Sequence, residues 1–320
     1  MYTFVADAMM RPWFCDQLSL VGASEMSFLH IVILAVVQGL AELLPVSSSA
    51  HVVVAEKLLG LNPTSPEMTL LLVMLHTGTM FAVILYFWKA WKASFFASRE
   101  VFKQQAIRLL IATALTGAVG LPLIKGIEKG MEKSGYLVKD ARGHLPKAEI
   151  ELLFGNLALV SAGLAAAGVL ILIAGLTTRK TAKNRPIGIR EAAWIGAIQG
   201  LCLPFRGFSR SGATISTGLL LGGLKARVEE FSFALAVILT PAANGREVLR
   251  LIKSQHEAGN SGLTWGLLAP SLLGMVLAFL AGLLALKWLS RWLEGGRWHL
   301  FGIYCLLAAA AVFALHLRGY

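Results

Sequence analysis

Charged residues are scarce in this sequence. Asp, Glu, Lys and Arg make up 15% of its 320 residues, 56% are hydrophobic, and the mean hydropathy is +0.68. Because a soluble domain carries about 25% charged residues, this composition excludes an ordinary soluble protein. Strand signals are also weak, and the apolar runs are rich in Leu and Ala. We therefore predict an all-α integral membrane protein.

Two other features are missing, a cysteine pattern and a signal peptide. Cys15, Cys202 and Cys305 are scattered, which excludes a disulfide framework and a cysteine metal motif. Residues 1–25 hold three acids and one arginine, whereas a signal peptide begins with positive charge and continues into an uninterrupted apolar core. We expect an N-terminal extension over 1–25 and a single membrane domain over 26–320.

The net charge of +11 does not indicate a nucleic-acid partner. Lys and Arg gather between the apolar runs, where the positive-inside rule places them in a membrane protein. The basic loops 89–108, 177–190 and 287–297 are expected in the cytoplasm, and the mixed or nearly neutral loops 125–151 and 251–264 outside. Both termini then face outward.

Several long stretches contain no Asp, Glu, Lys or Arg, and the longest of them covers 258–286. A spanning helix needs about 20 apolar residues. We predict six transmembrane helices, at about 68–88, 106–124, 152–176, 230–250, 265–287 and 299–317.

Two shorter apolar segments, 26–50 and 192–222, are interrupted by Pro, Gly and Ser and resemble each other. The first contains AVVQGLAELLPVSSSA and the second GAIQGLCLPFRGFSRSGAT. Both carry Gln-Gly-Leu, then a proline (Pro45 or Pro204), then a serine-rich turn, and they lie half a chain apart. This match of order and position indicates an internal duplication.

Each half would then contain one broken segment followed by three spans, and an odd number of spans inverts the second copy in the membrane. Broken segments at matching positions are typical of a binding site near the bilayer midplane. Irregular backbone at that depth must be satisfied by protein or by a water-filled cavity. We predict re-entrant helix pairs at 26–60 and 190–224, within inverted repeats of about 26–176 and 190–317.

Polar side chains gather on the first broken segment. Gln38 and Glu42 are spaced i, i+4 and share a helix face. Pro45 should end that helix, because the residue before a proline is pushed out of the helical region. The following turn carries hydroxyls and an imidazole, from Ser47, Ser48, Ser49 and His51. A turn entering a helix N-terminus offers free backbone N–H groups and suits phosphate.

The second broken segment adds a cation. Its turn holds Ser209, Arg210, Ser211 and Thr214, and Arg206 lies four residues before Arg210. An intramembrane arginine indicates a functional site by default, and its planar fork of donors matches a phosphate. Together the two turns fit an oxyanion carried on an apolar molecule.

Structural alternatives remain for each of these residues. Glu42 and Arg210 could form an ion pair that only stabilises the fold. The serines could satisfy backbone carbonyls, and Arg206 could extend to the interface. His51 could be a hydrogen-bonded core histidine, and we assign His76, a lone polar residue within a span, to packing or a supporting role.

The two motifs, QGLAELLPVSSSAH and GFSRSGATIS, with LHTGT at 75–79 and EEFSFALA at 229–236, carry a family resemblance over about residues 28–317. The chain resembles the bacterial undecaprenyl-diphosphate phosphatases, integral membrane proteins associated with bacitracin resistance. The resemblance implies hydrolysis of undecaprenyl diphosphate to the monophosphate, which recycles the lipid carrier of cell-wall synthesis. It also implies inverted repeats, a homodimer, and a site on the outer side of the bacterial cytoplasmic membrane. Bacitracin would act on the shared lipid substrate.

The resemblance also implies roles for particular residues. The catalytic set would be Glu42, Ser48, His51 and Arg210. The substrate-binding set would be Ser47, Ser49, Arg206, Ser209, Ser211 and Thr214. A divalent cation, Mg²⁺ or Ca²⁺, would be held by Gln38 and Glu42. Many members of the family have glutamate in place of Gln38, and because a Gln–Glu pair holds a metal more weakly than two carboxylates, the metal would be held more weakly here. Arg206 stands where the family often has proline.

Two questions stay open. The attacking group is either Ser48 activated by His51 or a water oriented by Glu42 and His51. The competing function is a lipid-carrier transporter, because inverted repeats with broken helices are also a transporter architecture. A transporter would use the same anion pocket but would need no general base, so the presence of Glu42 and His51 favours the enzyme.

Overall fold

The computed structural model describes residues 27–62, 65–134, 150–178, 186–257 and 264–319. Within these ranges the chain forms ten α-helices and one short 3-10 turn, and no strand occurs. The predicted N-terminal extension lies outside the described residues. The predicted all-helical class is confirmed for the part of the chain that the structure describes.

Five helices are long and apolar enough to cross a membrane. They are α4 (Pro66–Ser94), α5 (Arg99–Lys133), α6 (Leu157–Thr178), α10 (Trp265–Glu294) and α11 (Trp298–Leu317). The sixth predicted span lies within α9 (Lys225–Glu257), which is not one of the five. Its apolar stretch is short because Asn244, Arg246 and Glu247 follow within the same helix.

Several helices run past the predicted spans. α5 continues to Lys133, with Pro122 inside it, where a span over 106–124 was expected, and α10 continues to Glu294. Lys, Glu and Leu at these ends are good helix formers, so the helices extend into segments that charge alone suggested were loops.

Four shorter helices form two pairs at the places where interrupted segments were predicted. They are α2 (Phe28–Leu43), α3 (Ser48–Leu58), α7 (Ile189–Cys202) and α8 (Arg210–Leu220). α2 ends two residues before Pro45, as predicted. The turn is tighter than expected, because Ser47 reverses the chain at φ 67° and α3 already begins at Ser48.

The glycines of the two Gln-Gly-Leu motifs make equivalent contacts. A Cβ on Gly39 of α2 would lie 2.5 Å from Cβ of Ala281 on α10. A Cβ on Gly200 of α7 would lie 2.8 Å from the carbonyl oxygen of Thr116 on α5. Each short helix therefore packs closely against a long helix of the other half, and only glycine allows that approach.

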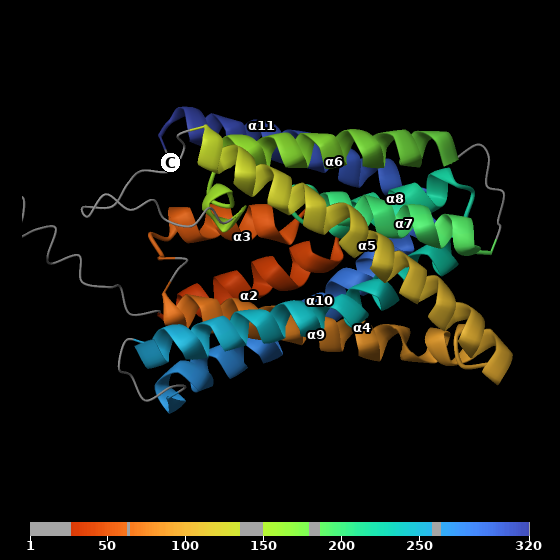
Figure 1. The fold of residues 1–320 in the computed structure, drawn as a ribbon, viewed down its shortest axis with the longest axis horizontal. Coiled ribbons are helices and arrows are strands. Elements are labelled where there is room, and N and C mark those ends of the chain that lie inside the picture. The colour runs from red at the N-terminus through yellow and green to blue at the C-terminus, as the bar shows by residue number, and fades with distance from the viewer. Residues whose placement is uncertain (1–26, 63–64, 135–149, 179–185, 258–263, 320) are drawn as a thin grey trace, which may run out of the picture.

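Most helices run roughly along the long axis of the molecule, α5 crosses them diagonally, and α6 and α11 pack side by side (Figure 1). The start of α2 and the end of α11 lie at one end of the molecule, and the turn between α4 and α5 lies at the other (Figure 1). The turns of the two broken pairs meet within the helix assembly, where Arg210 contacts Glu42 and Ser211 contacts Leu44.

Candidate functional site

Glu42 is the centre of a polar cluster built from both halves of the chain. Its carboxylate lies in the last turn of α2 and is 17% exposed. Nη2 of Arg210, the first residue of α8, donates to Oε1 at 2.7 Å. Ser48 Oγ donates to Oε2 at 2.5 Å, and Gln38 Nε2 donates to the same oxygen at 3.2 Å. Gln38, which was predicted to share a helix face with Glu42, and Arg210, the predicted intramembrane arginine, therefore both contact the Glu42 carboxylate.

Two buried polar atoms of this cluster have no hydrogen-bond partner among the described residues. They are Nη1 of Arg210 and Oε1 of Gln38. A buried group left unsatisfied costs about 1–3 kcal/mol, and more when it is charged. An anion would supply an acceptor for Arg210, and a cation would supply a partner for the amide oxygen of Gln38.

His76 joins the cluster from α4. Its Nε2 lies 3.7 Å from Oε2 of Glu42, and its Nδ1 lies 2.8 Å from the carbonyl oxygen of Leu72. Because the carbonyl only accepts, Nδ1 carries a hydrogen, and Nε2 is the nitrogen turned towards the carboxylate. The sequence assigned His76 to packing or a supporting role, yet an ionisable residue inside a charge-free run was itself a signal of a functional site.

A narrow cavity lies between these groups. Glu42, His76 and Arg210 line it together with Thr79 and Thr240 and with the apolar side chains of Met80 and Val237. The lining comes from α2, α4, α8 and α9, so both halves contribute to it. The lining combines charged, hydroxyl and apolar side chains, which are groups that a phosphate and the start of an apolar chain can contact.

The serines of each turn form hydrogen bonds with the backbone of the other turn, and two serines of the first turn contact each other. Ser47 Oγ lies 3.2 Å from Ser49 Oγ, and the N–H of Gly207 donates to Ser49 Oγ at 3.5 Å. Ser211 Oγ donates to the carbonyl of Leu44 at 3.2 Å. These bonds cross-link the two turns and give Ser49 and Ser211 a structural role in addition to the predicted one.

Ser47 has the only positive φ of a non-glycine residue in the described chain. Such a conformation is sparsely populated for residues with a side chain, and it persists only where the surroundings enforce it. It directs the chain so that Ser48, the next residue, reaches Glu42.

The other predicted site residues are not brought to Glu42. His51 Nδ1 lies 2.8 Å from the carbonyl oxygen of Ser47, and its Nε2 lies 2.7 Å from the hydroxyl of Tyr304 on α11. Because Nδ1 carries the hydrogen, Nε2 accepts from Tyr304, and neither nitrogen faces Ser48. The hydroxyl of Thr214 contacts Ser232 at 2.5 Å.

Ser209 and Arg206, the two remaining residues that were predicted to bind the substrate, also contact other parts of the protein. Ser209 is the N-cap of α8, and its Oγ accepts from the N–H of Gly212 at 3.2 Å. The guanidinium of Arg206 lies over the ring of Phe154, 4.3 Å from its centroid. Arg206 makes a cation–π contact there and is not among the residues that line the cavity at Glu42.

No group of three His, Cys, Asp or Glu side chains that could hold a metal ion occurs among the residues that the structure describes. The oxygen donors at the site are the Glu42 carboxylate and the unpartnered Oε1 of Gln38. Mg²⁺ is commonly bound by one or two carboxylates together with waters and substrate phosphates. The donor set therefore fits a cation that binds together with a phosphate substrate.

Comparison with known proteins places this geometry in a family context. Residues 31–311 match the family model described as bacitracin resistance protein BacA. The chain is 56% identical over 292 residues to undecaprenyl-diphosphatase 2 of Acinetobacter baylyi, covering 91% of this chain and 98% of that protein.

Two more distant relatives carry the same activity in their names. The undecaprenyl-diphosphatase of Rhodopirellula baltica is 32% identical over 91% of this chain and 98% of its own length. That of Korarchaeum cryptofilum is 30% identical over 91% of this chain and all of its own length. The similarity therefore extends over both halves of the chain and over both turns of the site.

Proposed function

The chain belongs to the family of the bacitracin resistance protein BacA, and we propose that it hydrolyses undecaprenyl diphosphate to undecaprenyl phosphate and inorganic phosphate. This reaction recycles the lipid carrier of cell-wall synthesis. The proposal for the site rests on one observation: Ser48 from the first half and Arg210 from the second half both donate to the carboxylate of Glu42, and Glu42 and Arg210 line a cavity.

The chain is an integral membrane protein, and we propose that it has six transmembrane helices and two re-entrant pairs, α2–α3 and α7–α8, in inverted repeats. The equivalent packing of Gly39 on α10 and Gly200 on α5 supports this arrangement. The basic loops support a position in the bacterial cytoplasmic membrane with the site open to the outer side. Family resemblance supports a homodimer and bacitracin acting on the shared lipid.

Arg210 would bind the diphosphate. Its Nη2 is held by Glu42, which fixes the plane of the guanidinium, and its Nη1 has no acceptor in the described structure. A terminal phosphate oxygen at Nη1 would satisfy this donor. Phosphoryl transfer is promoted mainly by neutralising charge on the transferred group, and a fixed guanidinium does this without reorganisation.

Ser48 is the proposed nucleophile and Glu42 its base. The hydroxyl already donates to Oε2 of Glu42 at 2.5 Å, so attack on the terminal phosphorus would transfer that proton to the carboxylate. The bond from the terminal phosphorus to the bridging oxygen breaks, and undecaprenyl phosphate leaves. Glu42 passes this proton to the leaving group and then accepts one from a water molecule, which attacks the phosphoserine. The bond from phosphorus to Ser48 Oγ breaks, inorganic phosphate leaves, and Glu42 returns the proton to Ser48. His51, which faces Tyr304, would position the turn through Ser47.

Gln38 and Glu42 would hold the divalent cation, Mg²⁺ or Ca²⁺, through the amide Oε1 and a carboxylate oxygen. When bound, the cation supplies further neutralisation of diphosphate charge. The amide contributes no formal charge, so these two residues alone would hold it loosely until the diphosphate adds its own oxygens.

The competing transporter function uses the same anion pocket but needs no proton transfer. The bond from Ser48 to Glu42 and the names of the relatives favour hydrolysis. To test the mechanism, the purified protein is mixed with prenyl diphosphate labelled in the terminal phosphate and quenched with acid. We expect label on Ser48 in the wild type and none in Ser48→Ala. Phosphate release at a normal rate by Ser48→Ala would instead establish water as the nucleophile.

A further inference from the structure

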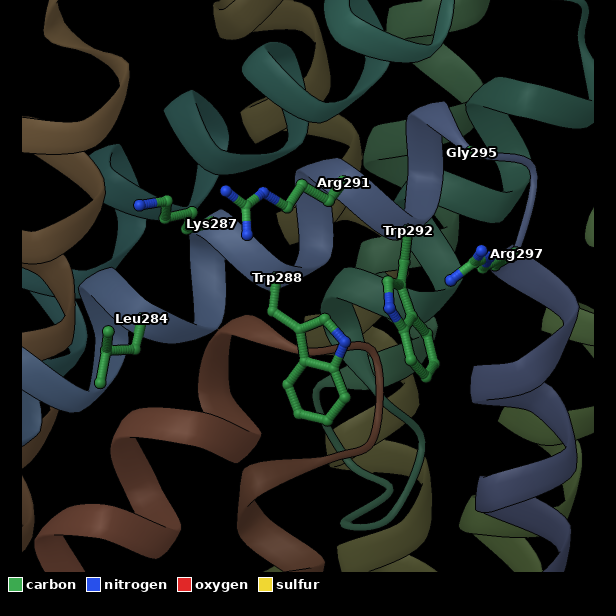
Figure 2. A pocket seen from close by; sticks show the side chains of 7 residues that line it. All are labelled: Leu284, Lys287, Trp288, Arg291, Trp292, Gly295 and Arg297. Carbon is green, nitrogen blue, oxygen red and sulfur yellow. The ribbon is translucent and has the colours of Figure 1, made fainter.

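A second group of cations lies at the end of α10 and the turn that follows it. Lys287, Trp288, Arg291 and Trp292 are spaced at three and four residues and share one face of the helix. Figure 2 shows the two indole rings side by side, with Lys287 and Arg291 extending from the same helix and Arg297 entering from beyond Gly295. These five side chains line an open pocket that is separate from the cavity at Glu42.

The pocket is strongly positive. Three of its lining residues are cations, and no carboxylate lines it. Lys287, Arg291 and Arg297 are exposed, and none of them forms a salt bridge with a carboxylate among the described residues. The nearest acid in the sequence, Glu294, does not line the pocket.

The tryptophans give the pocket a fixed wall. The rings of Trp288 and Trp292 meet edge to face, with centroids 5.0 Å apart, and Trp292 also packs on Phe301 of α11 at 5.2 Å. Trp288 is 43% exposed. Tryptophans at the end of an apolar span lie at the level of lipid head groups, where an apolar ring and a polar N–H are both satisfied.

An apolar track leads to the pocket along α10. Val276, Leu280 and Leu284 precede Trp288 at intervals of four residues, and each of them is at least half exposed. The same helix face is therefore apolar over two turns and cationic at its end. The positive-inside rule explains why cations occur here, but it does not require them to converge on a tryptophan-lined pocket at the end of an apolar track.

We propose that this pocket binds the phosphate head group of an anionic membrane phospholipid, with one acyl chain lying along Val276, Leu280 and Leu284. A guanidinium donates to phosphate through a planar fork, so Arg291 and Arg297 bind the head group, and Lys287 adds charge. Basic pockets on the cytoplasmic side of membrane proteins recognise anionic lipids in this way. Free phosphate would meet the cations but would leave the apolar track uncovered.

The test is native mass spectrometry of the detergent-purified protein with dioleoyl phosphatidylglycerol or dioleoyl phosphatidylcholine. We expect the wild type to bind phosphatidylglycerol at least about tenfold more tightly, which is about 1.4 kcal/mol. The triple variant Lys287→Gln/Arg291→Gln/Arg297→Gln should lose this preference. The matched control Lys89→Gln/Arg99→Gln/Lys103→Gln removes three exposed charges from another basic segment and should keep it.

A competition experiment distinguishes a phospholipid head group from free phosphate as the ligand. Inorganic phosphate should not displace phosphatidylglycerol at equal concentration, because it leaves the apolar track uncovered. Displacement by inorganic phosphate, equal binding of the two phospholipids, or an unchanged preference in the triple variant would overturn the proposal. Phosphate release by the triple variant reports its folding; if it does not fold, Arg291→Gln alone decides, with an expected loss of at least about threefold in phosphatidylglycerol affinity.

Discussion

Replacing Arg210 with lysine separates a catalytic cation from a structural one. The guanidinium donates Nη2 to Glu42 at 2.7 Å and keeps Nη1 without an acceptor. A lysine ammonium retains the charge and can pair with Glu42, but it does not reach the carboxylate and a phosphate in the fixed plane of the fork. A charge-assisted hydrogen bond contributes about 1.5–3 kcal/mol, so the loss of one predicts a decrease of about ten- to 150-fold in turnover.

The assay is single-turnover phosphate release from a prenyl diphosphate in detergent, with lipid binding measured in parallel. Arg227→Lys is the matched control, because Arg227 also donates to a buried carboxylate, that of Glu230, at 2.8 Å, away from the site. We expect Arg210→Lys to fold and insert normally, and Arg227→Lys to keep its turnover. Equal turnover in the wild type and Arg210→Lys would refute the phosphate clamp and leave a structural ion pair.

Four further predictions follow from the same geometry. Ser48→Ala should lower turnover by at least on the order of a thousandfold, because it removes the attacking group; retained turnover would argue for water. His76→Ala should lower turnover by about a hundredfold with little change in lipid binding, and an unchanged rate would restore the packing role. EDTA should abolish hydrolysis, and Gln38→Glu should lower the Mg²⁺ concentration needed for half-maximal rate; full activity in EDTA would exclude the cation. A cysteine at Ser134 should react with an impermeant reagent in intact cells, and labelling only after lysis would reverse the orientation.

The break between α2 and α3 was predictable because its causes are local. Pro45 cannot continue a helix, and the i, i+4 spacing of Gln38 and Glu42 places both on one face whatever the fold. The similarity of the two broken segments also predicted that their turns would lie together at one site, and Arg210 of the second turn contacts Glu42 just before the first turn.

The orientation of the individual side chains was not predictable in the same way. His51 lies one turn after Ser47, so sequence places it beside the serines, but the contact with Tyr304 on α11 decides where its ring points. Thr214 lies one turn after Arg210 and contacts Ser232 on α9. In both cases a residue distant in the sequence determines the contact, and no local pattern identifies that residue.

His76 lies at the site although the sequence did not assign it there. Its segment is free of charged residues and largely apolar, and a single histidine in such a run fits packing as well as chemistry. The distance to Glu42 depends on how α4 lies against α2, a tertiary relation that helical periodicity does not specify. The apolar character of the run predicted a span, and the packing of the helices places the histidine beside Glu42.

Phosphate release from purified undecaprenyl diphosphate by the wild type, Glu42→Gln and Glu229→Gln measures whether hydrolysis needs the carboxylate that Ser48 and Arg210 share. Glu229 is buried and the side chain of Glu42 is 17% exposed, and both accept a hydrogen bond from a serine, Glu42 from Ser48 and Glu229 from Ser290. We expect release by the wild type, a rate within about threefold of it in Glu229→Gln, and a loss on the order of 10²–10³ in Glu42→Gln. Equal rates in the two variants, or no release by the wild-type protein, would contradict this expectation.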